Sequence, residues 1–489
     1  MTTKNAVVLT SWGKNAGGGH LLRTKKLAKL LQSHTQPRTK HHTQFTATQP
    51  STTQPHTKPI KIDFAFLNSE AQSNVHNGKR RKKTWEDIGK FRTIIAKNHF
   101  IIIDSYDVQS KHYQALLSEL ESSDLGKKDF CKSILILDDE IGFLRFVAQT
   151  LREGKHTPQN LSKLSNALRH IFVLNGGLGS EKLLRDFMKN FTKDFAANLA
   201  SALDFRADFA KSSERLLSDF IKNNVFYGVK YFVANADFDF ARVSKKKHIK
   251  HILLTFGASD TQNHTQKTID ALSQIISTQK KHIFGSKVCA HIVLGEFYPH
   301  HLMPKSINTK SATNPTKITH KIYKNQSPKD FASVMKECDI AISAGGQSIY
   351  EIAQNALPLV IIPTATNQLT QSSAFAKKKA AILLDNIKNQ ANLKATNSQN
   401  HKKKQKNLKI QLPQKSHKSP KRKKTIKKNK ALKNPLSSTL LQDLPLQAQL
   451  SQALLALTPK NRARLSQNLQ KLQIGKSTKK IAHRFFTFC

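Results

Sequence analysis

Short apolar runs rich in β-branched residues recur along the 489-residue chain, and longer segments with helical spacing of apolar residues separate them. The runs are apolar throughout rather than at every second position, which is typical of parallel strands covered by helices on both faces. Parallel strands need crossover connections, so the pattern predicts an α/β protein with right-handed crossovers. The predicted strands are Ala6–Leu9, Asp63–Leu67, Phe100–Ile103, Ser133–Leu137, Ile171–Leu174, His251–Thr255, Ala290–Leu294, Ile340–Ser343 and Leu359–Ile362.

A polar, basic stretch between Ala234 and Lys250 divides the chain into two parts, each of which begins with a strand and a glycine turn. This repetition predicts two Rossmann-like parallel-sheet domains facing a cleft, an N-terminal one over residues 1–240 and a C-terminal one over 241–489. The chain is long enough for both to bury a core. Leucines at helical spacing between Leu440 and Leu472 predict one or two helices, within a terminal helical segment (436–485) that packs back on the fold.

The formal net charge of +48 is concentrated in part of the chain. Between Asn386 and Asn434 there are 17 Lys or Arg residues and no acidic residue, mixed with Asn, Gln and Ser. A second polar stretch, residues 32–59, is rich in Thr, Gln, His and Pro. Such low-complexity segments bury too little apolar surface to order themselves, which favours polar insertions. An RNA-binding tail is the alternative, but interleaved aromatic residues are absent, so we expect no nucleic-acid partner.

The four cysteines, Cys131, Cys289, Cys338 and Cys489, are far apart and form no CxxC pair. This spacing argues against a zinc site and a disulfide framework, and it favours a reducing compartment. No apolar run approaches the ~18 residues of a membrane span. We therefore expect a cytoplasmic protein, monomeric, without metal, other cofactor or membrane span.

A glycine-rich loop, Gly17-Gly18-Gly19, follows the first predicted strand and leads through His20 into a predicted helix. Glycines let the backbone turn sharply and approach a ligand closely. The helix start offers unpaired N–H groups, which suit an anion. His20 adds a base, and Arg23 adds a cation that either contacts an anion or closes the two domains by an ion pair.

The second part opens with Gly257, Ser259 and Asp260 directly after a predicted strand. Small residues let backbone N–H groups reach a phosphate, and the serine hydroxyl can add a hydrogen bond. The alternative is an ordinary turn in which Asp260 or Thr261 caps the next helix.

A second turn, Ser343 to Ser348, also joins a predicted strand to a helix and can hold a pyrophosphate at the helix start. Glu351 then lies in the first turn of that helix, where it can accept both ribose hydroxyls or simply favour the helix dipole. Asn367 and Gln368 are amides that suit sugar or base edges. The residues predicted to bind the nucleotide are Gly257, Ser259, Asp260, Ser343, Ala344, Gly345, Gly346, Gln347, Ser348, Glu351, Asn367 and Gln368.

Polar residues also end two strands of the first part. Asp104 can orient a substrate or His20, or it can cap a loop. Asp138, Asp139 and Glu140 follow the next strand, and we interpret them as structural or as a domain-contact loop rather than as a Mg²⁺ site.

These motifs, in this order, resemble the hydrolases of pseudaminic acid biosynthesis, which cleave UDP-2,4-diacetamido-2,4,6-trideoxy-β-L-altropyranose on the route to flagellin glycosylation. The resemblance implies a GT-B fold, similar to the lipid II-forming N-acetylglucosaminyltransferase. It also implies that His20 is catalytic, that Tyr106 lies near the sugar, and that UDP binds the C-terminal domain. The chain departs from the family at Asn235, where an arginine is usual.

Hydrolysis at the anomeric carbon requires an activated water and a stabilised leaving group. An imidazole with a pKa near ~6.5 can accept the proton of that water, and UDP leaves without a protein acid. We therefore expect a metal-independent, inverting hydrolase with His20 as general base. The alternative is a UDP-sugar-dependent glycosyltransferase of the same fold, in which the base activates an acceptor hydroxyl.

Overall fold

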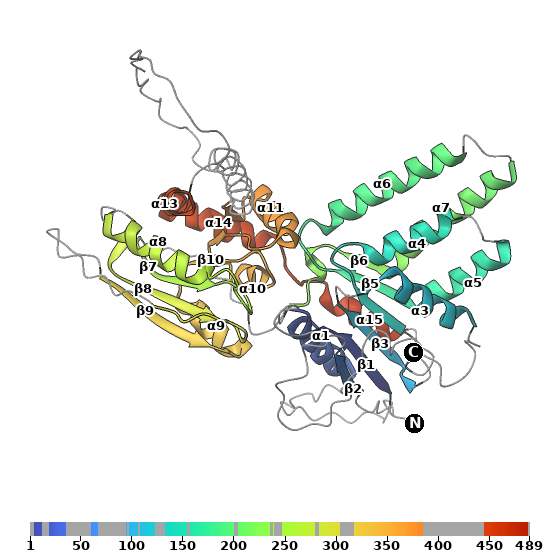
Figure 1. The fold of residues 1–489 in the computed structure, drawn as a ribbon, viewed down its shortest axis with the longest axis horizontal. Coiled ribbons are helices and arrows are strands. Elements are labelled where there is room, and N and C mark those ends of the chain that lie inside the picture. The colour runs from blue at the N-terminus through green and yellow to red at the C-terminus, as the bar shows by residue number, and fades with distance from the viewer. Residues whose placement is uncertain are drawn as a thin grey trace, which may run out of the picture.

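The computed structural model describes residues 4–11, 19–35, 60–66, 94, 97–105, 108–122, 133–153, 157–199, 204–234, 238, 247–278, 283–303, 317–384 and 445–487. These residues form two six-stranded sheets, and every strand pairing within them is parallel. The predicted α/β fold of two Rossmann-like sheets is confirmed by this topology (Figure 1).

The first sheet has the strand order β2-β1-β3-β4-β5-β6 and, with its helices, forms what we call the N-terminal half. Its strands are β1 (Asn5–Thr10), β2 (Lys61–Phe66), β3 (Phe100–Asp104), β4 (Ser133–Leu137), β5 (Ile171–Asn175) and β6 (Val225–Tyr227). Its helices are α1 (Gly19–Thr35), α3 (Ser110–Ser122), α4 (Gly142–Arg152), α5 (Pro158–Arg169), α6 (Ser180–Leu199), α7 (Asp204–Asn224) and the 3-10 turn η3 (Val229–Tyr231). All residues of β3, β4 and β5 are buried, because α3, α4, α5 and α7 cover one face and α1 covers part of the other.

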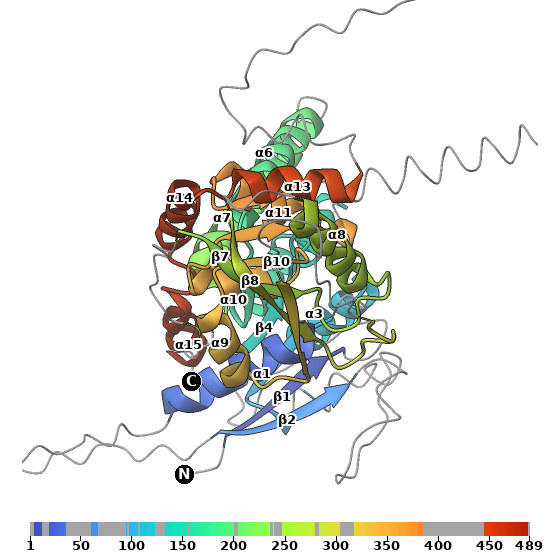
Figure 2. The same ribbon diagram turned by 90° about the vertical axis from the view of Figure 1, so that its left-hand side faces the viewer.

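The second sheet has the order β12-β11-β10-β7-β8-β9 and builds the C-terminal half. Its strands are β7 (Ile249–Thr255), β8 (Phe284–Leu294), β9 (Lys317–Lys324), β10 (Ile340–Ser343), β11 (Leu359–Ile361) and β12 (Ala381–Leu383). Its helices are α8 (His264–Thr278), α9 (Pro328–Glu337), α10 (Ser348–Gln354), η5 (Thr366–Gln368), α11 (Leu369–Lys377), α13 (Leu446–Ala456) and α14 (Pro459–Lys471). Figure 2 shows α13 lying against α8, on the face opposite α9 and α10.

The last helix, α15 (Thr478–Thr487), returns to the N-terminal half. The Phe485 ring lies 5.2 Å from the Phe100 ring and 6.0 Å from the Phe172 ring, and the Ser133 hydroxyl donates a 3.0 Å hydrogen bond to the Phe485 carbonyl. The division into residues 1–240 and 241–489 stays a prediction, but α15, which we grouped with the C-terminal domain, packs against the first sheet.

The return path passes close to the segment that leaves the first sheet. Gly475 has a φ of +71°, and a Cβ there would lie 2.4 Å from the Ala234 Cβ, so the close approach requires glycine. The Thr478 hydroxyl donates a 2.7 Å hydrogen bond to the Phe232 carbonyl. Two chain segments therefore cross between the halves side by side.

Among the described residues, no helix has the length and apolar character needed to span a membrane. Helices α6 and α7 instead form a long pair that projects from the N-terminal half (Figure 1). The exposed face of α6 carries charged residues, such as Lys182 and Asp186, which form a 2.8 Å ion pair.

Candidate functional site

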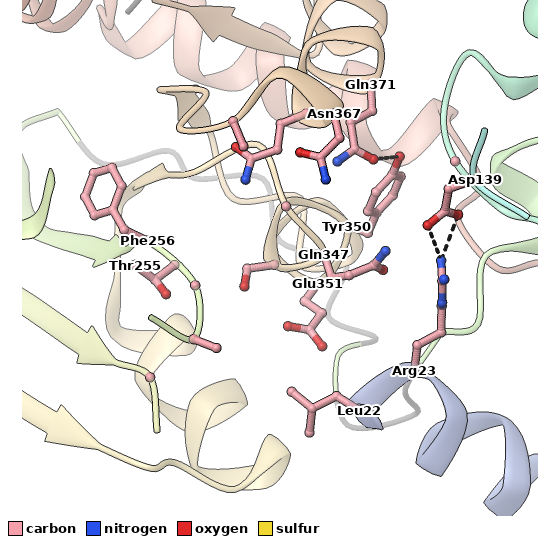
Figure 3. A pocket seen from close by; sticks show the side chains of 18 of the residues that line it. Leu22, Arg23, Asp139, Thr255, Phe256, Gln347, Tyr350, Glu351, Asn367 and Gln371 are labelled. Carbon is pink, nitrogen blue, oxygen red and sulfur yellow. Dashed lines mark hydrogen bonds and ion pairs between the residues drawn. The ribbon is translucent and has the colours of Figure 1, made fainter. Parts of the chain in front are cut away.

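A cleft of about 640 Å³ lies between the two halves. Its walls come from the carboxyl ends of β4, β5, β7 and β8, from the first turns of α1, and from the turn that leads into α10 (Figure 3). Ligands of parallel α/β sheets bind at the carboxyl ends of the strands. The cleft therefore lies where the sequence motifs were expected to meet.

Helix α1 forms the N-terminal wall of the cleft. The helix begins with Gly19 and His20, has no acidic residue in its first turn, and lines the cleft from Leu21 to Lys26. The side chain of His20 lies outside the described residues, as do Gly17, Gly18 and Tyr106. A helix start without acidic residues favours an anion.

Arg23 is held by two carboxylates of its own half. Its Nε and Nη2 donate to Asp104 at 2.9 and 2.6 Å, and its Nη1 donates to both oxygens of Asp139 at 2.8 Å. Burial disfavours the charged guanidinium, but the two carboxylates outweigh it and raise the Arg23 pKa. The ion pairs lie within the N-terminal half, so Arg23 does not close the domains. Asp104 is fully buried and binds Arg23, and it is not among the residues that line the cleft.

A different ion pair joins the halves across the cleft. The ammonium group of Lys26, on α1, contacts the carboxylate of Glu351, in the first turn of α10. Each side chain is 14% exposed. Glu351 was predicted to hold a ribose, and Figure 3 shows its carboxylate directed into the cleft. In this structure that carboxylate has a lysine partner.

The turn after β7 reaches the cleft with Gly257, whose φ is +84°, and with Ser259. Asp260 also lines it, but its carboxylate accepts 2.8 Å hydrogen bonds from the backbone N–H groups of His264 and Thr265. It also accepts one of 2.6 Å from the Thr265 hydroxyl. The carboxylate therefore caps the start of α8, which is the alternative to phosphate binding.

The turn before α10 is divided between cleft and core. Gly346, Gln347 and Ser348 line the cleft. Ser343, Ala344 and Gly345 are buried and do not line it, and the Ser343 hydroxyl donates to the Ala344 carbonyl at 3.0 Å. The end of β10 therefore lies in the core, and the contact of these three residues with a diphosphate stays a prediction.

Asn367 and Gln368 lie on the same wall of the cleft and differ in their surroundings. The Asn367 side chain is exposed. The Gln368 side-chain oxygen accepts from the backbone N–H groups of Gly345 and Thr364, at 3.0 and 2.9 Å. Gln368 thus ties two turns together, and the exposed Asn367 amide also lines the cleft (Figure 3).

Tyr350 and His264 are among the cleft residues that had no predicted role. Tyr350 is fully buried, and its hydroxyl accepts from the Leu178 backbone N–H and donates to Gln371, both at 2.8 Å. Its ring stacks on Phe232 at 4.4 Å, so it packs the halves together. His264 is buried beside Asp260, and burial lowers its pKa. Both residues follow a recognised turn closely. The hydrogen-bond partners of Tyr350 lie elsewhere in the sequence, whereas His264 contacts Gln262 and Phe256 close by.

The fold and the cleft define an α/β protein with a candidate ligand site between two parallel sheets. No family model matches the chain. The chain is 30% identical over 183 residues to the pseudaminic acid cytidylyltransferase and UDP-2,4-diacetamido-2,4,6-trideoxy-β-L-altropyranose hydrolase of Helicobacter pylori, covering 37% of this chain and 29% of that protein. It is 26% identical over 161 residues to the spore coat polysaccharide biosynthesis protein SpsG of Bacillus subtilis, covering 32% and 43%. The matches thus span less than half of each relative.

Solved structures with similar folds include glycosyltransferases. The glycosyltransferase of kitacinnamycin is 10% identical with a TM-score of 0.38, covering 99% of this chain and 100% of that one. MurG of Acinetobacter baumannii is 12% identical with a TM-score of 0.34, covering 78% and 85%. The assignment of the fold rests on the two parallel sheets themselves.

Proposed function

We propose that this protein hydrolyses a UDP-linked 2,4-diacetamido-2,4,6-trideoxy sugar at its anomeric carbon and releases UDP and the free sugar, as a step of pseudaminic acid biosynthesis. The observation that carries the proposal is the position of α1. This helix, which has His20 as its second residue, lines a cleft whose opposite wall is built from the turns at Gly257 and Gly346. The similarity to a Helicobacter pylori protein named for this hydrolysis supports it.

The proposed reaction is a single displacement. His20 accepts a proton from water, the water oxygen bonds to the anomeric carbon, and the bond from that carbon to UDP breaks with inversion. An imidazole with a pKa near ~6.5 is partly neutral at cytoplasmic pH, and general-base catalysis of this kind contributes roughly 10²–10⁴-fold. UDP departs with the bonding electrons and needs no protein acid and no metal.

The C-terminal wall supports UDP binding. Gly257, Ser259 and the segment from Gly346 to Ser348 bring short side chains and backbone to the cleft, and α10 begins there without a side-chain cap. Backbone N–H groups at a helix start favour phosphate oxygens. Glu351 and Asn367 can accept or donate hydrogen bonds to ribose or base. This assignment fits a monomer acting in the cytoplasm.

The test is an assay of UDP release from a panel of UDP-sugars, with EDTA present and no acceptor. We expect release from the 2,4-diacetamido-2,4,6-trideoxy sugar, since hydrolysis needs no acceptor and transfer does. His20→Asn and His20→Phe should keep UDP affinity and lose at least 100-fold in turnover. His320→Asn, on β9, is the matched control. Near-normal turnover in His20→Asn would contradict the role of His20, and UDP release only after addition of an acceptor would contradict hydrolysis.

A further inference from the structure

A cluster of nitrogen and sulfur ligands lies on the second sheet, outside the residues that line the cleft. Its members are His251 on β7 and Cys289 and His291 on β8. His251 is the register partner of Cys289, and His291 follows two residues later, so all three side chains lie on one face of the sheet. Their ligand atoms lie within 4.8 Å of one another. The strand pairing therefore gathers three metal-binding groups from two strands.

The hydrogen bonds of His291 orient its ring. Its Nε2 lies 2.9 Å from Nδ1 of His251, and its Nδ1 lies 3.1 Å from the Tyr323 hydroxyl. The His291 side chain is completely buried. When Nδ1–H donates to the tyrosine oxygen, the Nε2 lone pair is directed toward the cluster. A second hydrogen bond of this kind fixes the tautomer of histidines that bind metals.

A carboxylate lies next to the cluster. Oε2 of Glu337, at the end of α9, lies 3.9 Å from Nε2 of His291. The same oxygen lies 3.7 Å from the ammonium group of Lys321, and the glutamate side chain is 53% exposed. Lys321 is thus a competing partner, and Glu337 can turn between the lysine and the cluster.

We propose that His251, Cys289 and His291 bind a zinc ion, with Glu337 as the fourth ligand. Tetrahedral zinc with bond lengths of 2.0–2.3 Å places its ligand atoms roughly 3.3–3.8 Å apart. The separations in the cluster, from 2.9 Å to within 4.8 Å, bracket this range, so small side-chain rotations suffice. A thiolate with two imidazoles favours zinc over magnesium or calcium, which prefer oxygen ligands.

Binding changes the protonation of one group. The Cys289 thiol releases its proton to solvent and binds as the thiolate. His251 binds through Nδ1 and carries its proton on Nε2, while His291 binds through Nε2 and keeps its Nδ1 proton on the tyrosine oxygen. Both imidazoles stay neutral, and their mutual hydrogen bond is replaced by two bonds to the metal.

The zinc site has a structural role, because it lies apart from the lining of the cleft. It would cross-link β7, β8 and the end of α9. Strand β7 carries the turn with Gly257 and Ser259, so the cross-link would stabilise the base of that turn. The inference is independent of the proposed hydrolysis, because it predicts metal-dependent stability without metal-dependent turnover.

The test is spectroscopic and uses the full-length protein after treatment with EDTA and its removal. Titration with Co²⁺ should produce a thiolate-to-cobalt charge-transfer band and the visible bands of tetrahedral cobalt, saturating at one equivalent. Zn²⁺ should displace the cobalt and raise the midpoint of thermal unfolding. Cys289→Ser should abolish the charge-transfer band, and His251→Gln should weaken Co²⁺ binding at least tenfold.

Two matched variants act as controls. Cys338→Ser removes a nearby thiol that donates a 3.3 Å hydrogen bond to the Val334 carbonyl. His320→Gln removes a histidine of β9 that lies on the other face of the sheet from the cluster. Both should keep the wild-type spectrum. Circular dichroism verifies that each variant is folded. Absence of a thiolate band in the wild type, or a band that persists in Cys289→Ser, would overturn the proposal. If Cys289→Ser fails to fold, the test rests on His251→Gln. Weaker Co²⁺ binding by His251→Gln would then support the zinc site, and unchanged Co²⁺ binding would overturn it.

Discussion

Lys26, on the first helix of the N-terminal half, forms an ion pair with Glu351, on the other side of the cleft. The ion pair spans the cleft at the Glu351 carboxylate, which we assign to the ribose. Nucleotide binding then requires Glu351 to exchange an ammonium partner for two hydroxyls. The ion pair is thus a competitor of the proposed ligand as well as a link between the halves.

The first prediction follows from this competition. Glu351→Gln should weaken UDP binding by about tenfold, since hydrogen bonds to charged groups contribute ~1.5–3 kcal/mol. Lys26→Gln should strengthen UDP binding a few-fold, because it frees the carboxylate. Lys29→Gln, one turn further along α1, is the control and should change nothing. Isothermal titration calorimetry measures all three. If Lys26→Gln weakens binding as much as Glu351→Gln does, Lys26 binds the diphosphate instead.

The second prediction concerns Arg23, which neutralises a fully buried aspartate. Arg23→Ala should lower the free energy of unfolding by ~3–5 kcal/mol, because it removes the arginine that neutralises the buried Asp104 carboxylate. Arg152→Ala removes an exposed arginine paired with Asp194 at 2.8 Å and should cost at most ~1 kcal/mol. Urea unfolding measures both losses. Adding Asp104→Asn to Arg23→Ala should restore part of the stability, and equal losses for the two single arginine variants would contradict this account.

The third prediction is a dependence of stability on pH. Burial raises the pKa of Asp138 to about 6, although its carboxylate accepts hydrogen bonds from Gly142 and Phe143. Between pH ~4 and 6 the folded protein holds a proton that the unfolded chain has lost, so this group lowers the free energy of unfolding as pH rises through that window. Over the whole window this group lowers the free energy of unfolding by about 3 kcal/mol.

Asp138→Asn tests this sign, since asparagine does not titrate. Its free energy of unfolding relative to wild type should improve by ~2 kcal/mol between pH 4.5 and pH 7.5. Urea unfolding at both pH values gives the comparison. A difference between the two proteins that stays constant with pH would show that the Asp138 pKa is not raised.

The fourth prediction concerns the return of α15 to the first sheet. Phe485→Ala should cost ~3–5 kcal/mol, because the ring is fully buried against Phe100 and Phe172. Leu455→Ala, at a position that is 46% exposed on α13, should cost less than ~1 kcal/mol. Amide hydrogen exchange should accelerate in β3 and β4 of the Phe485 variant. Faster exchange confined to the second sheet would contradict this packing.

The sequence predicted the central strands because burial on both faces demands continuous apolar residues. All nine predicted strands are present. The three that were missed, β6, β9 and β12, are all edge strands. Strand β9 mixes lysine, threonine and histidine with its apolar residues, and β6 and β12 have only three residues each. Edge strands contain few of the continuous apolar residues on which the prediction rests.

Gly257 and Gly346, which we singled out from the sequence, line the cleft, because glycine turns after parallel strands lie at one edge of a sheet. The sequence did not reveal which polar side chains already have partners. Asp104 meets Arg23 across 81 residues, and Lys26 meets Glu351 across 325. His251 and Cys289 were not recognised as paired ligands for the same reason: their proximity comes from strand register, which cysteine spacing along the chain does not report.

The return of α15 also orders the biogenesis of the protein. The last strand of the N-terminal half ends at Tyr227, yet the part of one sheet face that α1 leaves uncovered is packed by a helix that ends at Thr487. The ribosome synthesises the whole C-terminal half before α15 can cover that part of the sheet. The first sheet must therefore persist with an exposed apolar surface during synthesis, which makes it the part of the nascent chain most in need of protection by a chaperone.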